Sequence, residues 1–325
     1  MRKFVLLLIV ATVVVPGTVA VCQAQQRLNP VIELLEARKP VFGLYAPSNR
    51  RSRPGAPVDT TIPVKTPDQL AADALGNTIT DYIFDGSMEG NFDRGYESFT
   101  AFAAGMQKGG VLSTKAARLH HPLVVKTSKL APDYELARLR IAKQLNLGVS
   151  AIVFVGVESA DEVKQGLAMM RFKSTGGTRP DDVGGAPAFW GMNETQYKEK
   201  ADVWPLNPKG ELVNWTIVES TEGLAHIREI AAVPGIAVLF PGAGTLRGVF
   251  STTDANGQRT LDAAGWEAAI QQVLAACKEF KVPCGYPANE NDIEERMRQG
   301  FSVFVINWGE GGNRAVEIGR AAAKR

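Results

Sequence analysis

The sequence predicts a (β/α)₈ barrel of the TIM-barrel type, and three observations lead to this fold class. Eight apolar runs of strand length recur along the chain, and stretches with helical spacing of apolar residues lie between them. The runs lack apolar–polar alternation, which is typical of strands buried on both faces of a parallel sheet. Eight strand and helix pairs in one domain match a closed barrel. An open doubly wound sheet is the alternative, but no Gly-rich phosphate-binding motif follows the first strand.

The strands are predicted from runs rich in Val, Ile, Leu and Phe, which are bounded by turn residues and favour extended backbone. In chain order they are VFGLYA (41–46), DYIFD (81–85), LVVKT (123–127), AIVFV (151–155), VNWTIVE (213–219), IAVLFP (236–241), PCGYP (283–287) and FSVFVIN (301–307).

The helices are predicted from apolar residues spaced three and four apart, with polar or acidic residues in the first turn. The first of them, TPDQLAADAL, has Thr66 and Asp68 near its start. The predicted helical segments are 66–75, 131–146, 159–172, 220–233, 261–280, 289–299 and 310–325.

Residues 1–24 are predicted to be a signal peptide, and residues 25–325 a single barrel domain. Two basic residues precede an apolar run from Phe4 to Val15, and small residues precede possible cleavage after Ala20 or Ala24. This order predicts export to the periplasm or the extracellular space. A lipidated Cys22 and an uncleaved membrane anchor are the alternatives, although the run is shorter than the ~20 residues of a spanning helix.

The amino-acid composition argues against two classes of binding partner, nucleic acids and membranes. The chain has 36 basic and 34 acidic residues, which argues against a nucleic-acid-binding surface, and no later segment is apolar enough for a stable membrane span. Beyond the predicted leader only Cys277 and Cys284 remain. We expect them to be small buried residues, with a single disulfide as the alternative that an oxidising compartment favours.

Two stretches, 47–66 and 171–211, are too long for ordinary connections. Long loops of this kind in compact domains form lids, binding loops or subunit contacts, and the alternative is an exposed insertion without function. The second stretch places Arg179 among glycines, so it is a candidate substrate-binding residue. Trp190, Trp204 and Trp215 are expected to pack in the core or an interface, with a pocket for a larger substrate as the alternative.

Polar side chains at the carboxyl ends of the predicted strands are the candidate site, because barrel chemistry gathers there. They are Asp85, Ser87, Glu89, Lys126, Glu158, Glu219, Thr245 and Asn307. This acid-rich set with one lysine favours a divalent metal with oxygen ligands, Mg²⁺ or Mn²⁺. His120, His121 and His226 are expected away from the site, which leaves proton transfer to carboxylates, Lys126 or a metal-bound water.

Longer stretches resemble the HpcH/HpaI aldolase/citrate lyase family. They include DYIFDGSMEGNFD, HPLVVKTS, GVSAIVFVGVESADEV and TIVESTEGLAHIREIAAVPGIAVLFPGAGTL. The resemblance implies a barrel of the phosphoenolpyruvate/pyruvate type. It also implies homo-oligomers and cleavage or formation of a carbon–carbon bond beside a 2-oxo acid, through a metal-stabilised enolate.

The same resemblance implies roles for particular residues. Glu219 matches the family's metal-binding glutamate, whereas the metal-binding aspartate of G-P-x-D-L falls on Thr245 in GAGTL. A threonine is a weaker ligand, so Glu158 or Glu89 would have to replace the missing carboxylate.

Further family positions have also changed. After the second strand the family has an Asp-x-Glu-His motif, which reads Ser-Met-Glu-Gly here when aligned without gaps. With a small insertion Asp85 takes the place of the aspartate, and the histidine is missing in either alignment. Lys126 replaces the arginine that binds the substrate carboxylate, and Ile217 replaces a glutamine.

The first functional hypothesis is a carbon–carbon lyase or aldolase with an altered site. Its metal would be bound by Glu219, with Glu158 and Thr245 as weaker ligands. Lys126, Gly244, Thr245 and Arg179 would bind the substrate, and Asp85, Glu89 and Lys126 would be catalytic. The second hypothesis is an exported, non-catalytic protein that binds a small carboxylate on the same barrel. A metal-independent enzyme with a different reaction is the third.

Overall fold

The computed structural model describes residues 26–49 and 63–325. The predicted signal peptide, Cys22 and the middle of the first long loop lie outside the described residues.

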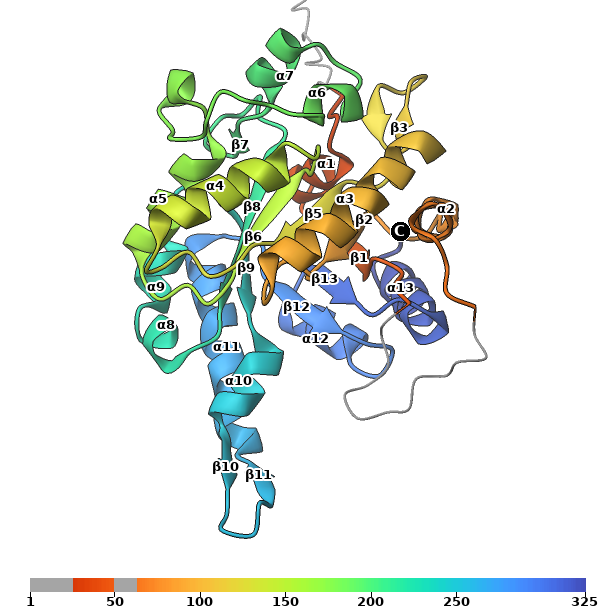
Figure 1. The fold of residues 1–325 in the computed structure, drawn as a ribbon. Helices are drawn as coiled ribbons and strands as arrows, with labels where there is room; N and C mark the ends of the chain where they lie inside the picture. Colours follow the sequence, from red (N-terminus) through yellow and green to blue (C-terminus); the bar gives the residue numbers. More distant parts are fainter. Residues whose placement is uncertain (1–25, 50–62) are drawn as a thin grey trace, which may run out of the picture.

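All eight predicted strands are present, and they run parallel. They are β1 Val41–Tyr45, β2 Tyr82–Asp85, β5 Leu123–Lys126, β6 Ala151–Phe154, β8 Leu212–Val218, β9 Ile236–Pro241, β12 Gly285–Ala288 and β13 Val303–Ile306. Each pairs with the next around the sheet, and β13 pairs with β1. A parallel bridge between Leu239 and Cys284 joins β9 to β12. The predicted barrel is therefore confirmed (Figure 1).

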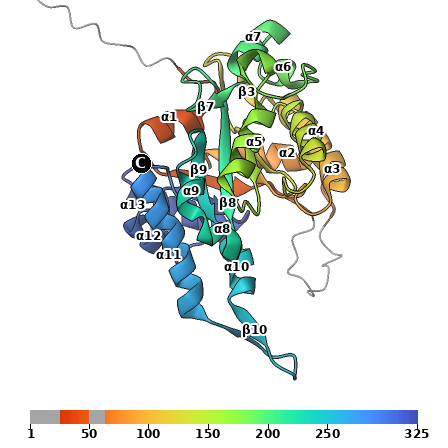
Figure 2. The ribbon, with the colours of Figure 1, turned by 90° about the vertical axis from the view of Figure 1, so that its left-hand side faces the viewer.

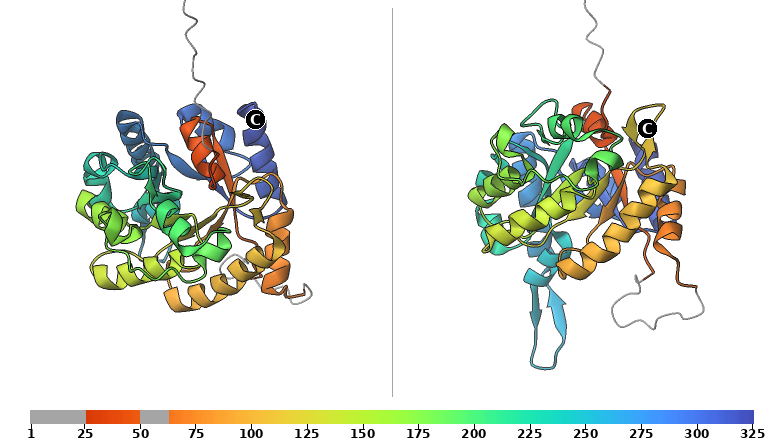
Figure 3. Two further views of the ribbon diagram at one scale, coloured as in Figure 1. Left: turned by 90° about the horizontal axis from the view of Figure 1, so that it is seen from above. Right: turned by 45° about the horizontal axis from the view of Figure 1, so that its top comes forward.

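Helices surround the strands (Figure 3). They are α1 Pro30–Glu36, α2 Pro67–Gly76, α3 Phe92–Gly109, α4 Tyr134–Leu145, α5 Ala160–Met170, α8 Thr221–Ala225, α9 Ile227–Ala231, α10 Ala243–Val249, α11 Ala263–Phe280, α12 Ile293–Gln299 and α13 Glu310–Ala322. Every predicted helix is found, although the segment 220–233 is divided at His226.

Helix α3 is a long element that the pattern of apolar residues does not predict. Its glycines mark close packing, because a Cβ on Gly95 would lie 2.4 Å from the Ser87 carbonyl oxygen, and one on Gly105 would lie 2.9 Å from the Ala71 Cβ. These residues, which weaken the helical pattern in sequence, allow α3 to approach α2 and the loop after β2.

The second long stretch, 171–211, connects α5 to β8 and contains α6 Ala186–Phe189, α7 Glu194–Lys200 and β7 Val203–Trp204. Strand β7 pairs with the start of β8 through Val203 and Leu212. The stretch thus lies where the strands begin, and Figure 1 shows α6 and α7 at the opposite end from α10. Of the roles open to such a long loop, a lid over the carboxyl ends of the strands is therefore not supported.

A hairpin of β10 Ser251–Thr253 and β11 Arg259–Leu261 follows α10 and extends away from the barrel (Figure 2). A second, short hairpin, β3 Leu112–Ser113 with β4 Arg118–Leu119, lies between α3 and β5. Among the described residues, no helix is both long and apolar enough to cross a bilayer.

Cys277 and Cys284 form a disulfide, with their Cα atoms 5.6 Å apart. The expectation of two unpaired cysteines is therefore wrong. Helix α11 ends at Phe280, and the turn that follows brings the chain back to the start of β12, so that both cysteines are buried side by side.

The core has two parts, which explains the apolar strands. One cluster fills the barrel interior and includes Tyr82, Phe84, Val153, Trp215 and Phe240. The larger cluster lies between the strands and the surrounding helices. Because both strand faces are packed, neither face carries the polar alternation of an exposed sheet.

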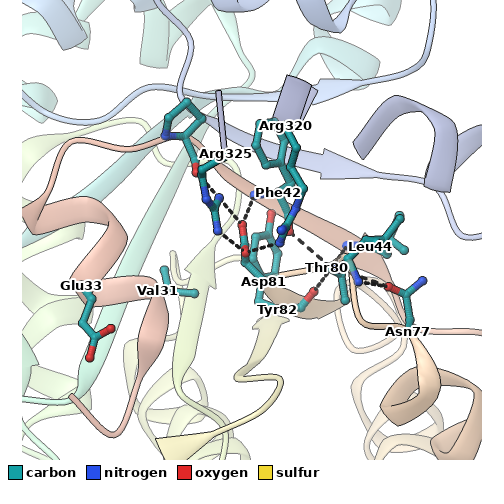
Figure 4. A network of polar contacts seen from close by, with 12 residues as sticks. Val31, Glu33, Phe42, Leu44, Asn77, Thr80, Asp81, Tyr82, Arg320 and Arg325 are labelled. Carbon is teal, nitrogen blue, oxygen red and sulfur yellow. Dashed lines mark hydrogen bonds and ion pairs between the residues drawn. The ribbon is translucent and has the colours of Figure 1, made fainter. Parts of the chain in front are cut away.

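The C-terminal helix is attached to the barrel through a buried carboxylate (Figure 4). Asp81 lies before β2, and its Oδ1 accepts hydrogen bonds from Arg320 Nη2 at 2.8 Å and Arg325 Nη2 at 2.6 Å. Its Oδ2 accepts from Arg325 Nη1 and from the Phe42 N–H, each at 2.8 Å. The Asp81 side chain is only 7% exposed, so these ion pairs are weakly screened by solvent.

We expect Asp81→Asn to lower the free energy of unfolding by about 3 kcal/mol, because it leaves two half-buried guanidinium groups without a charge partner. Urea denaturation followed by circular dichroism measures the change. Glu317→Gln, on the exposed face of α13, is the matched control and should have little effect. Equal stability of the two variants would contradict the role of Asp81.

Candidate active site

A cavity of about 210 Å³ lies at the end of the barrel where the strands finish, which we call the mouth. Strands β1, β2, β5, β6, β8, β9, β12 and β13 each contribute to its lining, as does the start of α10. Its charged side chains are Lys126 and Glu219, and its remaining walls are mainly apolar. The structure therefore brings together four predicted site residues: Lys126, Glu219, Gly244 and Thr245.

Lys126 ends β5 and has a side chain that is 16% exposed. Its Nζ lies 2.8 Å from Glu89 Oε2, so the two predicted catalytic residues form an ion pair at the mouth. Its backbone carbonyl accepts a hydrogen bond from Gln144 Nε2 at 2.9 Å, which ties the strand end to α4. The lysine is thus held at the cavity by contacts on both its backbone and its side chain.

Glu219 follows β8 and lies close to the turn before α10. A Cβ on Gly242 would be 2.4 Å from its Oε2, so glycine is required there for the carboxylate to fit. Burial raises the pKa of Glu219, and hydrogen bonds from the Thr245 hydroxyl and the Gly156 N–H, with the charge of Lys126, oppose the increase. A carboxyl group with a raised pKa exchanges protons more readily near neutral pH.

The turn from Gly242 to Thr245 begins α10, and no side chain caps this helix. The first N–H groups of a helix have no carbonyl partner within it. Ala243, Gly244 and Thr245 all line the cavity, so the start of α10 supplies backbone donors at the same place as Lys126 and Glu219. These donors favour an oxygen anion.

Trp215 forms part of the apolar floor, a role that the sequence analysis gives only as an alternative. It is fully buried, and its ring stacks on Phe240 with centroids 5.4 Å apart. Its Nε1 has no hydrogen-bond partner among the described residues. Alternation along β8 signals this placement, because Trp215, Ile217 and Glu219 point to one side of the strand and all three line the cavity.

Asp85 does not line this cavity. Its Oδ1 accepts hydrogen bonds from the Ser87 N–H at 2.8 Å and the Ser87 hydroxyl at 2.5 Å. Both residues line a neighbouring cleft of about 270 Å³ between the loop after β1 and helix α3. The loop after β2 therefore divides the predicted residues, with Glu89 beside Lys126 and Asp85 in the next cleft.

Glu158 is also not part of the cavity lining. Its Oε2 lies 2.8 Å from Lys129 Nζ, and this hydrogen bond lowers the pKa of Glu158. Lys129 is near Glu219 as well, because a Cβ on Gly156 would contact both side chains within 4 Å. Glu158 thus neutralises a second lysine at the mouth.

Arg179, which is predicted to bind the substrate, does not line the cavity. It is fully buried within the stretch 171–211, with its guanidinium carbon 4.4 Å from the centre of the Phe172 ring. Its Nη2 donates to Asn146 Oδ1 at 3.2 Å and to the Tyr197 hydroxyl at 3.1 Å. Its contacts are with this stretch and with Asn146 at the end of α4, and it does not line the cavity.

The histidines lie outside the cavity, as expected. His121 precedes β5 at the other end of the barrel, and burial lowers its pKa to about 4. His226 Nδ1 lies 3.1 Å from the Glu158 carbonyl oxygen, between α8 and α9. Neither residue lines the mouth cavity.

The side chains at the mouth form a poor set of ligands for the predicted Mg²⁺ or Mn²⁺ ion. Among residues 26–49 and 63–325, no group of three or more His, Cys, Asp or Glu side chains is placed to hold a metal ion. Glu219 faces the Thr245 hydroxyl, while Glu89 and Glu158 are paired with lysines. Since Mg²⁺ and Mn²⁺ require several oxygen ligands, the side chains present do not fit a tightly bound metal.

Known proteins share sequence features and the fold of this chain. A model of the HpcH/HpaI aldolase/citrate lyase family matches residues 114–315, more than half of the chain. An HpcH/HpaI aldolase/citrate lyase family protein from Burkholderia cenocepacia J2315 has a similar structure, with a TM-score of 0.64 and 18% identity over 91% of this chain and 98% of that one.

Two other solved structures share the fold. Citrate synthase SbnG has a TM-score of 0.56 at 16% identity, covering 90% of this chain and 96% of its own. Macrophomate synthase has a TM-score of 0.55 at 18% identity, covering 90% and 87%. A search of curated protein sequences gives no match. At these identities the structural likeness establishes the fold.

Proposed function

The chain belongs to the HpcH/HpaI aldolase/citrate lyase family, and we propose that it acts as a carbon–carbon lyase or aldolase on a small 2-oxo acid. One observation supports this most strongly. A lysine, a carboxyl group with a raised pKa and the uncapped start of α10 line a single cavity with an apolar floor. A concave, mainly apolar site with a few convergent polar groups is the usual form of a small-molecule site.

Substrate binding rests on Lys126 and the start of α10. The ammonium group pairs with the carboxylate of the 2-oxo acid, and its low exposure reduces screening by solvent. The N–H groups at the start of α10 donate to the 2-oxo oxygen. The carbon chain lies against Phe84, Trp215 and Phe240.

The proposed reaction uses Glu219 to move a proton. In the cleavage of a 4-hydroxy-2-oxo acid, its carboxylate accepts the hydroxyl proton, the bond between the third and fourth carbons breaks, and an aldehyde leaves. The electron pair remains as an enolate, whose oxygen faces Lys126 and α10. Glu219 then returns the proton to the third carbon. Its raised pKa suits this double role.

A non-catalytic carboxylate-binding protein is the second candidate. It is favoured by the Lys126–Glu89 ion pair, because a cation that is already neutralised stabilises a developing negative charge less strongly. It is also favoured by Thr245, which provides a neutral hydroxyl where the family pattern has an aspartate.

Export and self-association remain proposals. The disulfide between Cys277 and Cys284 supports an oxidising compartment, such as the periplasm or the extracellular space. Assembly as a homo-oligomer follows from the family resemblance alone.

Exchange of the pyruvate methyl protons in D₂O, measured by NMR, tests the proposal. We expect exchange above the uncatalysed rate, a loss of at least about 100-fold in Glu219→Gln, and no loss in Glu97→Gln, an exposed residue of α3. Parallel samples with EDTA and with Mn²⁺ show whether a metal contributes. A pyruvate-induced thermal shift without exchange would favour the binding protein, and equal exchange in Glu219→Gln would refute the assigned role.

A further inference from the structure

A second cavity of about 330 Å³ lies at the end of the barrel opposite the mouth. Its walls come from the segments that precede β1, β12 and β13, and from the end of α11. Four cationic side chains line it, namely Arg38, Lys39, Lys278 and Lys281, and no acidic residue does. The disulfide between Cys277 and Cys284 also lies in its wall. We call it the basic pocket.

None of the four cations is neutralised within the described residues. Within residues 26–49 and 63–325, no ion pair or side-chain hydrogen bond involves any of them, whereas neighbouring Arg27 and Arg228 pair with Glu36 and Glu279. Nearby carboxylates are therefore engaged with other basic residues, and four positive charges remain around one cavity.

Helix termini explain only part of this charge. Helices α1 and α11 end here, at Glu36 and Phe280, and each carboxyl end carries about half a negative charge. Together they offset about one of the four cations, so an excess of about three positive charges remains. Stabilisation of the two helix ends therefore does not account for all four basic residues.

Two of the four basic residues have left-handed backbone conformations. Arg38 has φ 51° and Lys281 has φ 57°, in the left-handed region where glycine is the favoured residue. An L residue there costs about 1 kcal/mol or more. The chain thus carries long basic side chains at two positions where glycine would relieve strain. Strained residues that persist in this way are common at binding sites.

We propose that the basic pocket binds a small ligand that carries a phosphate group. Lysine ammonium groups attract phosphate as point charges, and an arginine adds two parallel hydrogen bonds. A doubly charged anion matches the excess positive charge, and the cavity has room for more than the phosphate alone. The phosphate belongs either to a soluble small molecule or to a phospholipid headgroup.

The test uses the full chain and inorganic pyrophosphate in isothermal titration calorimetry, at two salt concentrations. We expect one site per chain, weaker binding at higher salt, and a loss of at least about tenfold in the Lys278→Gln/Lys281→Gln variant. Lys115→Gln/Lys173→Gln removes two exposed lysines that line no part of the pocket, and it should bind as the unchanged protein does.

Lys281→Gly separates binding from folding. Glycine relieves the left-handed backbone, so this variant should be at least as stable as the parent and still bind pyrophosphate more weakly. Sedimentation with phosphatidylglycerol vesicles, compared with phosphatidylcholine vesicles, distinguishes the two sources of phosphate. Specific retention by the anionic vesicles indicates a headgroup, and pyrophosphate binding alone indicates a soluble ligand. Absence of both, or unchanged binding in the lysine variants, overturns the proposal.

Discussion

Replacing Lys126 by methionine is expected to weaken binding of a 2-oxo acid by at least about 100-fold, because it removes the cation that pairs with the ligand carboxylate. The change also leaves Glu89 without its partner, 2.8 Å away in the unchanged protein, next to a cavity that already contains Glu219. Two carboxylates would then oppose an anionic ligand. Calorimetric titration with pyruvate measures the affinity, and methionine preserves most of the length and volume of the lysine chain.

Lys129→Met is the matched control for this prediction. Lys129 is another lysine at the mouth, but it pairs with Glu158 and lies outside the cavity lining. Its loss should reduce pyruvate affinity only slightly, through the weakened positive potential near Glu219. Similar losses in the two variants would mean that general electrostatic attraction, and not contact with Lys126, controls binding.

The barrel could be predicted from sequence because its strands are buried on both faces and therefore appear as uninterrupted apolar runs. Helix α3 could not, since Gly95 and Gly105 weaken its pattern and their value appears only when the packing distances are known. The stretch 171–211 lies between α5 and β8, so its place at the end where the strands begin follows from the order of the elements in the chain. The disulfide depends instead on a turn that brings Cys284 back to α11.

Part of the candidate site could also be predicted from sequence, and part could not. Strand ends identify Lys126, Glu219 and Thr245, because parallel strands deliver their last residues to one end of a barrel. Sequence position cannot show that Glu89 turns toward Lys126 while Asp85 turns toward Ser87, since side-chain direction in a loop depends on contacts. The interior position of Arg179 depends on packing against the Phe172 ring, which a glycine-rich sequence does not indicate.

The second large effect is expected for Thr245→Asp, which should increase the affinity for Mn²⁺ by about 100-fold or more. The Thr245 hydroxyl already hydrogen-bonds Glu219, so an aspartate here would bring a second carboxylate to the same point. Without metal, repulsion between the two carboxylates should raise the pKa of Glu219 further and lower the thermal stability of the protein. A divalent cation would relieve that repulsion, so the melting temperature should recover as Mn²⁺ is added.

Thr245→Asn is the control, because it has nearly the same shape as the aspartate variant and lacks the charge. It should neither gain metal affinity nor lose stability in the absence of metal. Adding Glu219→Gln to Thr245→Asp should abolish the gain, because one carboxylate remains. If the unchanged protein binds Mn²⁺ as tightly as the aspartate variant, then Thr245 is not what separates this site from a metal centre.

The lysines at the mouth also limit the gain in Mn²⁺ affinity, because Lys126 and Lys129 both act electrostatically on Glu219 and would repel an added cation. A gain much smaller than expected in Thr245→Asp, recovered by Lys129→Met, would assign part of the lost metal affinity to those lysines.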